Sequence, residues 1–139
     1  MKLTLAICAV TLWAASVPAA TPPVTPEMGA ESAALVWLGL VDAGKYDESW
    51  SSASSLFRQK ISESQWQSAA SSTRVPLGVL KSRTLRSATS KSTLPGAPDG
   101  QYVVIQFDSS FEHKASAVET VTPVLDADGK WHVSGYYIK

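Results

Sequence analysis

The side chains best suited to metal or nucleophilic chemistry are few and scattered in this sequence. The two histidines, His113 and His132, lack the i, i+4 spacing of a metal-binding HExxH motif, and the single cysteine, Cys8, lies far from both. No Gly-x-Ser-x-Gly string marks a strained turn that exposes a nucleophilic serine. The sequence therefore assigns no catalytic, cofactor-binding or metal-ligating residue.

Acid–base chemistry is the enzymatic possibility that remains. Glu119 shares a predicted strand face with apolar residues, and a semi-buried carboxylate can act as a general base. Tyr102 or Tyr136 would then donate a hydrogen bond to a developing oxyanion. Asp108, the other carboxylate considered, falls on the strand face opposite the core. The simpler interpretation of Glu119, which we favour, is a structural ion pair with Arg83.

The same side chains also suit a ligand cleft. Small-molecule sites combine an apolar wall with a few polar groups, and we expect such a cleft between the first helix and the concave face of a sheet. The expected occupant is a small hydrophobic ligand or an envelope protein, with no cofactor. The candidate cleft residues are Arg83, Tyr102, Glu119 and Tyr136 at the mouth, with Trp37 and Trp50 in the apolar wall.

A long apolar helix is predicted to follow the first prolines of the chain. Thr25 is a plausible N-cap, Pro26 fits the first helical position, and Gly44 fits the left-handed position just after the helix end. Residues 33–41 are almost wholly apolar, and a helix that is apolar all round is typically buried. We therefore expect this helix to be buried on all sides.

Two further helices are predicted before the chain changes character. One spans residues 47–57, because apolar residues there recur on a single helical face, at Tyr46, Trp50, Ala53 and Phe57. The other begins at Ser62, where Ser-Glu-Ser-Gln matches a capping box, and ends before residue 74, because Pro76 disfavours helix at Val75.

The second half of the sequence predicts four strands, at residues 79–90, 102–111, 115–125 and 130–138. Residues 126–129 (Asp-Ala-Asp-Gly) form a hairpin signal between the last two strands. In the last strand, simple alternation places Tyr137 on the face of Trp131 and Val133, and Tyr136 on the other face. The prediction is an α+β fold, with about three N-terminal helices packed on a curved four-stranded antiparallel sheet.

The N-terminus predicts a cleaved signal peptide over residues 1–19. Lys2 precedes an uncharged apolar run, and small residues follow it, with the cut expected after Ala19. Cys8 reads as apolar filler of that run. Residues 20–29 are expected to be a flexible Pro/Thr tether, and residues 30–139 a single domain. The protein is therefore expected to be exported, periplasmic or secreted, with no membrane span after cleavage.

Charge excludes one class of partner. The chain has 12 basic and 12 acidic residues, so it lacks the basic surface of a nucleic-acid-binding protein.

Several local strings together resemble a known family. They are residues 34–46 (ALVWLGLVDAGKY), 74–78 (RVPLG), 94–102 (LPGAPDGQY) and 128–131 (DGKW), the last followed by Gly-Tyr-Tyr at 135–137. In this order they resemble the domain-of-unknown-function 4019 family of exported bacterial proteins. The order of helices and strands is also similar to the cone-shaped nuclear-transport-factor-2-like fold, which hosts isomerases, dehydratases and binding modules alike.

Three functions remain open on the sequence. The first is a small non-enzymatic envelope module that binds a ligand or a protein. The second is an isomerase- or hydrolyase-like enzyme that uses Glu119 as base with a tyrosine. The third is a structural module that forms a homodimer through its sheet.

Processing of the N-terminus is the first testable prediction. Expressed in a bacterium with an intact export pathway, the protein should be recovered outside the cytoplasm, starting at Ala20 or Thr21 and carrying no lipid. Intact-mass measurement checks this directly. Retained Met1, or a diacylglycerol on Cys8, would contradict the prediction.

Overall fold

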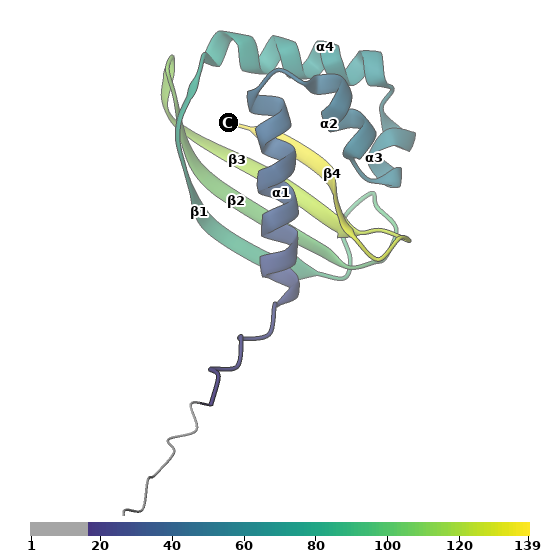
Figure 1. The fold of residues 1–139 in the computed structure, drawn as a ribbon. Coiled ribbons are helices and arrows are strands. Elements are labelled where there is room, and N and C mark those ends of the chain that lie inside the picture. The colour runs from purple at the N-terminus through teal and green to yellow at the C-terminus, as the bar shows by residue number, and fades with distance from the viewer. Residues whose placement is uncertain (1–16) are drawn as a thin grey trace, which may run out of the picture.

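The computed structural model describes residues 17–139, so most of the predicted signal peptide, with Cys8, lies outside the described residues. Helices come first and a single sheet follows, with α1 lying across the concave face of the sheet and the shorter helices gathered at one end (Figure 1). The elements are α1 (Pro26–Asp42), α2 (Tyr46–Ser52), α3 (Ser55–Lys60), α4 (Glu63–Arg74), the 3-10 helix η1 (Val75–Leu77), β1 (Leu80–Lys91), β2 (Tyr102–Phe111), β3 (Lys114–Leu125) and β4 (Trp131–Ile138).

The sheet confirms the predicted fold class. Its strand order is β1-β2-β3-β4, and each neighbouring pair is antiparallel. The strands begin and end within about a residue of their predicted bounds, since turn residues flank each of them. Among residues 17–139, no helix combines the length and the apolar composition that a membrane span requires.

Both ends of α1 form as the sequence predicts. The Thr25 side chain accepts a hydrogen bond from the Met28 N–H at 3.3 Å, Pro26 starts the helix, and Glu27 lies in its first turn. After Asp42 the chain turns at Gly44, which has φ +73° and so occupies the region that glycine tolerates best. The helix begins before the domain boundary predicted at residue 30.

The expectation that α1 is buried on all sides is wrong. Its buried residues form one stripe, whereas Leu35 is 43% exposed and Val36 is 72% exposed. The sheet covers only one side of the helix, and α2 to α4 pack near its end instead of over its back (Figure 1). The residues of the buried stripe are Ala30, Ala34, Trp37, Leu38 and Val41.

The helix predicted over residues 47–57 is divided into α2 and α3. Ala53 has extended backbone angles, and Ser54 caps α3 by accepting a hydrogen bond from the Phe57 N–H. The Ser54 N–H itself donates to the Val133 carbonyl of β4 at 2.9 Å. A serine can exchange helical bonds for local and tertiary ones, and this break brings the chain onto the edge of β4.

The capping box of α4 is confirmed. The Ser62 side chain accepts from the Gln65 N–H, and the Gln65 side chain accepts from the Ser62 N–H. The helix runs to Arg74, further than predicted, because Val75 keeps helical angles and the chain continues as a 3-10 turn through Pro76.

A β-bulge changes which tyrosine of β4 faces the core. Thr122 pairs with Gly135 while Pro123 pairs with Val133, so Ser134 is an extra residue in β4. Beyond the bulge the alternation reverses, and Tyr136 joins the core while Tyr137 is 53% exposed. Simple alternation grouped Tyr137 with Trp131 and Val133, and this grouping is wrong, because the bulge places Tyr136 with Val133 against the core instead.

An aromatic cluster fills the space between the helices and the sheet. Trp37, Phe57, Trp66 and Tyr136 pack with ring centroids 5.1–6.4 Å apart, mostly edge to face. Buried Ser49 satisfies both indoles: its carbonyl accepts from Trp37 Nε1 at 2.7 Å, and its hydroxyl accepts from Trp66 Nε1 at 2.9 Å. The serine therefore fixes how α2 sits between α1 and α4.

The packing of α1 yields a stability prediction. Leu38 is fully buried, and Leu38→Ala should lower the free energy of unfolding by about 2–5 kcal/mol, because it leaves a cavity in the core. Leu35→Ala on the exposed side of the same helix is the matched control, with an expected loss of about 1 kcal/mol or less. Chemical denaturation measures both, and equal losses would show that α1 does not pack as described.

Candidate functional site

Glu119 of β3 is fully buried and hydrogen-bonded on both carboxylate oxygens. Oε1 accepts from Arg83 Nε at 2.7 Å and from the Ser109 hydroxyl at 2.5 Å. Oε2 accepts from the Tyr136 hydroxyl at 2.6 Å and from Arg83 Nη2 at 3.1 Å. The predicted ion pair between Glu119 and Arg83 is confirmed. It is bidentate, because two guanidinium nitrogens bind the two carboxylate oxygens.

Asp42 extends this cluster to the helices. Its carboxylate lies at the end of α1 and accepts from Arg83 at 2.7 and 3.0 Å and from Arg74 Nη2 at 2.6 Å. We call Asp42, Arg74, Arg83 and Glu119, with Ser109 and Tyr136, the charge network. Its two carboxylates and two guanidinium groups balance in charge, which is what burial of charged groups requires.

Arg74 is the least satisfied member of the charge network. The residue is 5% exposed, and within the described part of the chain its Nε and Nη1 atoms have no hydrogen-bond partner. Its guanidinium carbon lies 4.8 Å from the centre of the Phe111 ring. This cation–π contact stabilises the positive charge of the buried guanidinium.

The protonation states follow from these contacts. Burial alone would raise the pKa of Asp42, but hydrogen bonds from Arg83 and Arg74 outweigh it and leave that pKa below its usual range. Burial, followed by the negative charge of Glu119, raises the pKa of Tyr136. Tyr136 is therefore a neutral hydrogen-bond donor, and Asp42 is ionised at neutral pH.

The six candidate cleft residues do not surround one hollow. Arg83, Glu119 and Tyr136 meet in the charge network, and the Trp37 ring lies 5.5 Å from that of Tyr136. Tyr102 lies elsewhere on β2, where its hydroxyl donates to the Pro98 carbonyl at 2.6 Å. Trp50, on α2, is partly buried and its indole N–H donates to the Ile61 carbonyl at 2.8 Å.

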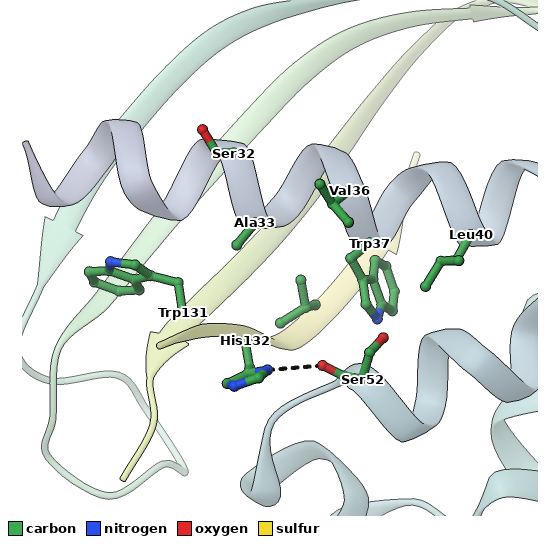
Figure 2. Close-up of a pocket in the computed structure, with 9 residues that line it drawn as sticks. Ser32, Ala33, Val36, Trp37, Leu40, Ser52, Trp131 and His132 are labelled. Carbon is green, nitrogen blue, oxygen red and sulfur yellow. Dashed lines mark hydrogen bonds between the residues drawn. The ribbon is translucent and has the colours of Figure 1, made fainter. Parts of the chain in front are cut away.

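An apolar groove opens between α1, β4 and the end of α2. It has a volume of about 370 Å³. Figure 2 shows Trp131 at one end of the groove and Trp37 and Leu40 toward the other, with Ala33 and Val36 on the side of α1. The lining residues are Ser32, Ala33, Val36, Trp37, Leu40, Ser52, Trp131, His132 and Val133.

His132 fixes one wall of the groove. Its Nδ1 atom lies 3.0 Å from the Ser52 carbonyl oxygen (Figure 2). Its Nε2 atom lies 2.8 Å from Oδ2 of Asp128. Partial burial would lower the pKa of His132, but the Asp128 carboxylate and the Ser52 carbonyl outweigh it, and the pKa is raised. The ring thereby ties the β3–β4 turn to the end of α2.

Of the residues that line the groove, the predicted cleft included only Trp37. The signal for the groove was present in α1, which has more apolar residues than one buried stripe needs, so that Val36 and Leu40 remain beside the groove. Trp131 and His132 reach it because the Ser54 N–H bonds to Val133 and so brings β4 against the break between α2 and α3. No spacing in the sequence connects these segments.

Metal binding has no evident place in this arrangement. Across residues 17–139 the structure has no group of three or more His, Cys, Asp or Glu side chains placed to hold a metal ion. The groove contributes one histidine, and both of its ring nitrogens already have partners.

A family model described as "Protein of unknown function (DUF4019)" matches residues 33–136. The chain belongs to this family. The match runs from the middle of α1 to Tyr136, so it includes the charge network and most of the groove. Comparison with curated proteins finds no match.

The charge network yields a second stability prediction. Arg83→Ala would leave Glu119 and Asp42 without their shared cation, and it should cost about 3–5 kcal/mol of unfolding free energy. Arg86→Ala is the control on the same strand, because Arg86 pairs with Asp108 at 3.4 Å with both side chains more than half exposed. That change should cost about 1 kcal/mol or less. Urea unfolding at neutral pH measures both changes. A loss of about 1 kcal/mol or less for Arg83→Ala would show that water reaches the charge network.

Proposed function

We propose that this member of the DUF4019 family is a non-enzymatic envelope module that binds a small hydrophobic molecule in the groove between α1 and β4. The observation that carries the proposal is the apolar lining of a groove that no other part of the described chain covers. A surface of this kind costs free energy in water unless a ligand or partner covers it.

Size and chemistry both suit a small ligand. The volume of about 370 Å³ falls within the range of small-molecule pockets, roughly 300–1,000 Å³. Trp131 offers a large rigid surface for an aromatic or aliphatic group, whereas Trp37 is 3% exposed and adds little surface to the lining. The polar groups of the lining are few, namely Ser32, Ser52 and His132. A molecule that is mostly apolar, with at most one or two hydrogen-bonding groups, matches this lining.

The alternative of an enzyme that uses Glu119 has less support. A general base needs an oxygen that can reach a substrate proton. Glu119 has no exposed surface, and hydrogen bonds from Arg83, Ser109 and Tyr136 occupy both of its oxygens. This carboxylate is better suited to holding strands and helices together than to taking up a proton.

The alternative of a dimer through the sheet also has less support. The face of the sheet opposite α1 is polar where β1, β2 and β3 meet, and a hollow there is lined mainly by hydroxyl groups. A stable homodimer interface is normally more apolar than the rest of the surface. The residues on this face include Ser82, Thr84, Asp108, Ser110 and Ser116.

Export is part of the proposal. It is supported by the apolar run after Lys2 and the small residues before Ala20. A hydrophobic ligand in the envelope could be a lipid fragment, a quinone-like ring or an imported apolar metabolite, all of which share the chemistry that the groove requires.

Binding of a neutral apolar probe tests the groove. The fluorescence of N-phenyl-1-naphthylamine rises when it leaves water, and we expect it to bind the purified protein. Val36→Arg should weaken this binding by tenfold or more, about 1.4 kcal/mol, because it places a charged side chain across the groove. Val36 is 72% exposed, so folding should be preserved.

Leu35→Arg is the matched control for the probe experiment. Leu35 is the next residue on α1, also exposed, and does not line the groove. It should leave the affinity unchanged. Equal binding by the Val36→Arg variant would place the probe elsewhere, and no binding by the unaltered protein would contradict the proposed function. A specific envelope protein retained by the unaltered chain but not by Val36→Arg would identify a protein as the occupant instead.

A further inference from the structure

His132 stands between two groups that can only accept hydrogen bonds. Nδ1 faces the backbone carbonyl of Ser52 at 3.0 Å, and Nε2 faces the carboxylate of Asp128 at 2.8 Å. A neutral imidazole carries one N–H, so it can satisfy only one of these two acceptors. The imidazolium ion carries two, and it alone satisfies both contacts.

The two contacts join separate parts of the groove wall. Asp128 lies in the β3–β4 turn, and Ser52 is the last residue of α2. Next to them, the Ser54 N–H donates to Val133, and Asp126 accepts from the N–H and the hydroxyl of Ser55. Loss of either His132 contact therefore weakens the seam that holds β4 against the break between α2 and α3.

The charges around His132 come mainly from its own turn. Asp128 and Asp126 both favour the protonated ring, whereas Lys130, in the same turn, is exposed. On the side of α2 the facing group is the neutral Ser52 carbonyl, and Glu48 is paired with Lys45 at 3.5 Å. On the side of α1, the groove residues Ser32, Ala33 and Val36 carry no charge.

We propose that His132 is a proton-dependent latch: its imidazolium form holds the groove wall closed against α2, and loss of the proton loosens that wall. The latch would regulate the site of the proposed function, and the link to ligand binding rests on that function. A protein outside the cytoplasm meets changes of external pH, and histidine is the side chain that responds to them.

The direction of the pH effect follows from linkage. The folded-state pKa of His132 is raised above the unfolded value of about 6.5. Its contribution to the latch is therefore complete below that unfolded value and is lost as pH rises through the higher folded pKa. The pKa values of Asp126 and Asp128 are lowered, by hydrogen bonds from Ser55 and from His132 respectively. Both carboxylates thus remain ionised throughout this window.

The first arm of the test uses the protein without any probe. NMR titration gives the pKa of each histidine, with His113 as an internal comparison, since it is exposed and lies 3.6 Å from its Glu112 partner. Hydrogen exchange at about pH 5.5 and 8.5 then gives the protection factor of the Ser54 N–H. Protection should fall on raising the pH, by about tenfold for each unit by which the His132 pKa exceeds the unfolded value.

Two variants separate the latch from other causes. Asp128→Asn removes the anionic acceptor, so it should lower the pKa of His132 and reduce the pH dependence of Ser54 protection. His132→Gln should abolish that dependence and give low protection at both pH values. His113→Gln is the control and should behave as the unaltered protein. Protection of Ser54 that is the same at both pH values in the unaltered protein would overturn the latch.

The second arm links the latch to the groove. N-phenyl-1-naphthylamine is neutral at both pH values, and its affinity should be several-fold higher at the lower pH in the unaltered protein and pH-independent in His132→Gln. An affinity for the probe that is the same at both pH values would overturn the regulation and would not affect the proposed function. A latch that responds to pH in a protein that binds no probe would support the latch and contradict the function of the groove.

Discussion

Glu119 lies in the middle of β3 with none of its side chain exposed, and a carboxylate in that position has to be neutralised from within the protein. Arg83 supplies the charge, and Ser109 and Tyr136 supply the remaining hydrogen bonds. Arg83 also binds Asp42, so the residue that neutralises Glu119 also holds the end of α1. Arg74, the last residue of α4, binds the same Asp42 carboxylate and so connects α4 to the network. The network thus joins α1 and α4 to all four strands. A different arrangement of these helices and strands would leave a charged side chain buried without a partner.

This constraint also explains where the groove lies. Asp42 holds the end of α1 near β1, and the Trp37 indole bound to Ser49 holds its middle against α2. The helix is therefore fixed, and within residues 17–139 no further helix covers the side of α1 that faces β4. Val36 remains exposed as a consequence and lines the same groove as Trp131. The charge network holds these elements in place, and the groove lies beside it.

Local signals in the sequence account for most of the fold. Thr25, Pro26 and the Ser62 capping box act within one helical turn. The helix starts that they set can therefore be predicted without knowledge of tertiary contacts. Three features depended on distant partners: the break at Ser54 needs Val133, the bulge at Ser134 needs β3, and the exposed side of α1 depends on where α4 packs. The pairing of Glu119 with Arg83 could be predicted because both fall on core-facing strand positions. The groove could not, because its walls come from three segments with no common spacing.

The bond from the Ser54 N–H to Val133 has a consequence for how copies of this protein behave in a crowded compartment. It occupies part of one edge of the sheet and leaves β1 as the open edge among the described strands. An open edge invites strand addition and aggregation. β1 carries Lys81, Arg86 and Lys91, and its register shifts twice, between Leu80 and Ser82 and again between Leu85 and Ser87. Like charges and an irregular edge both oppose the pairing of β1 strands from two copies.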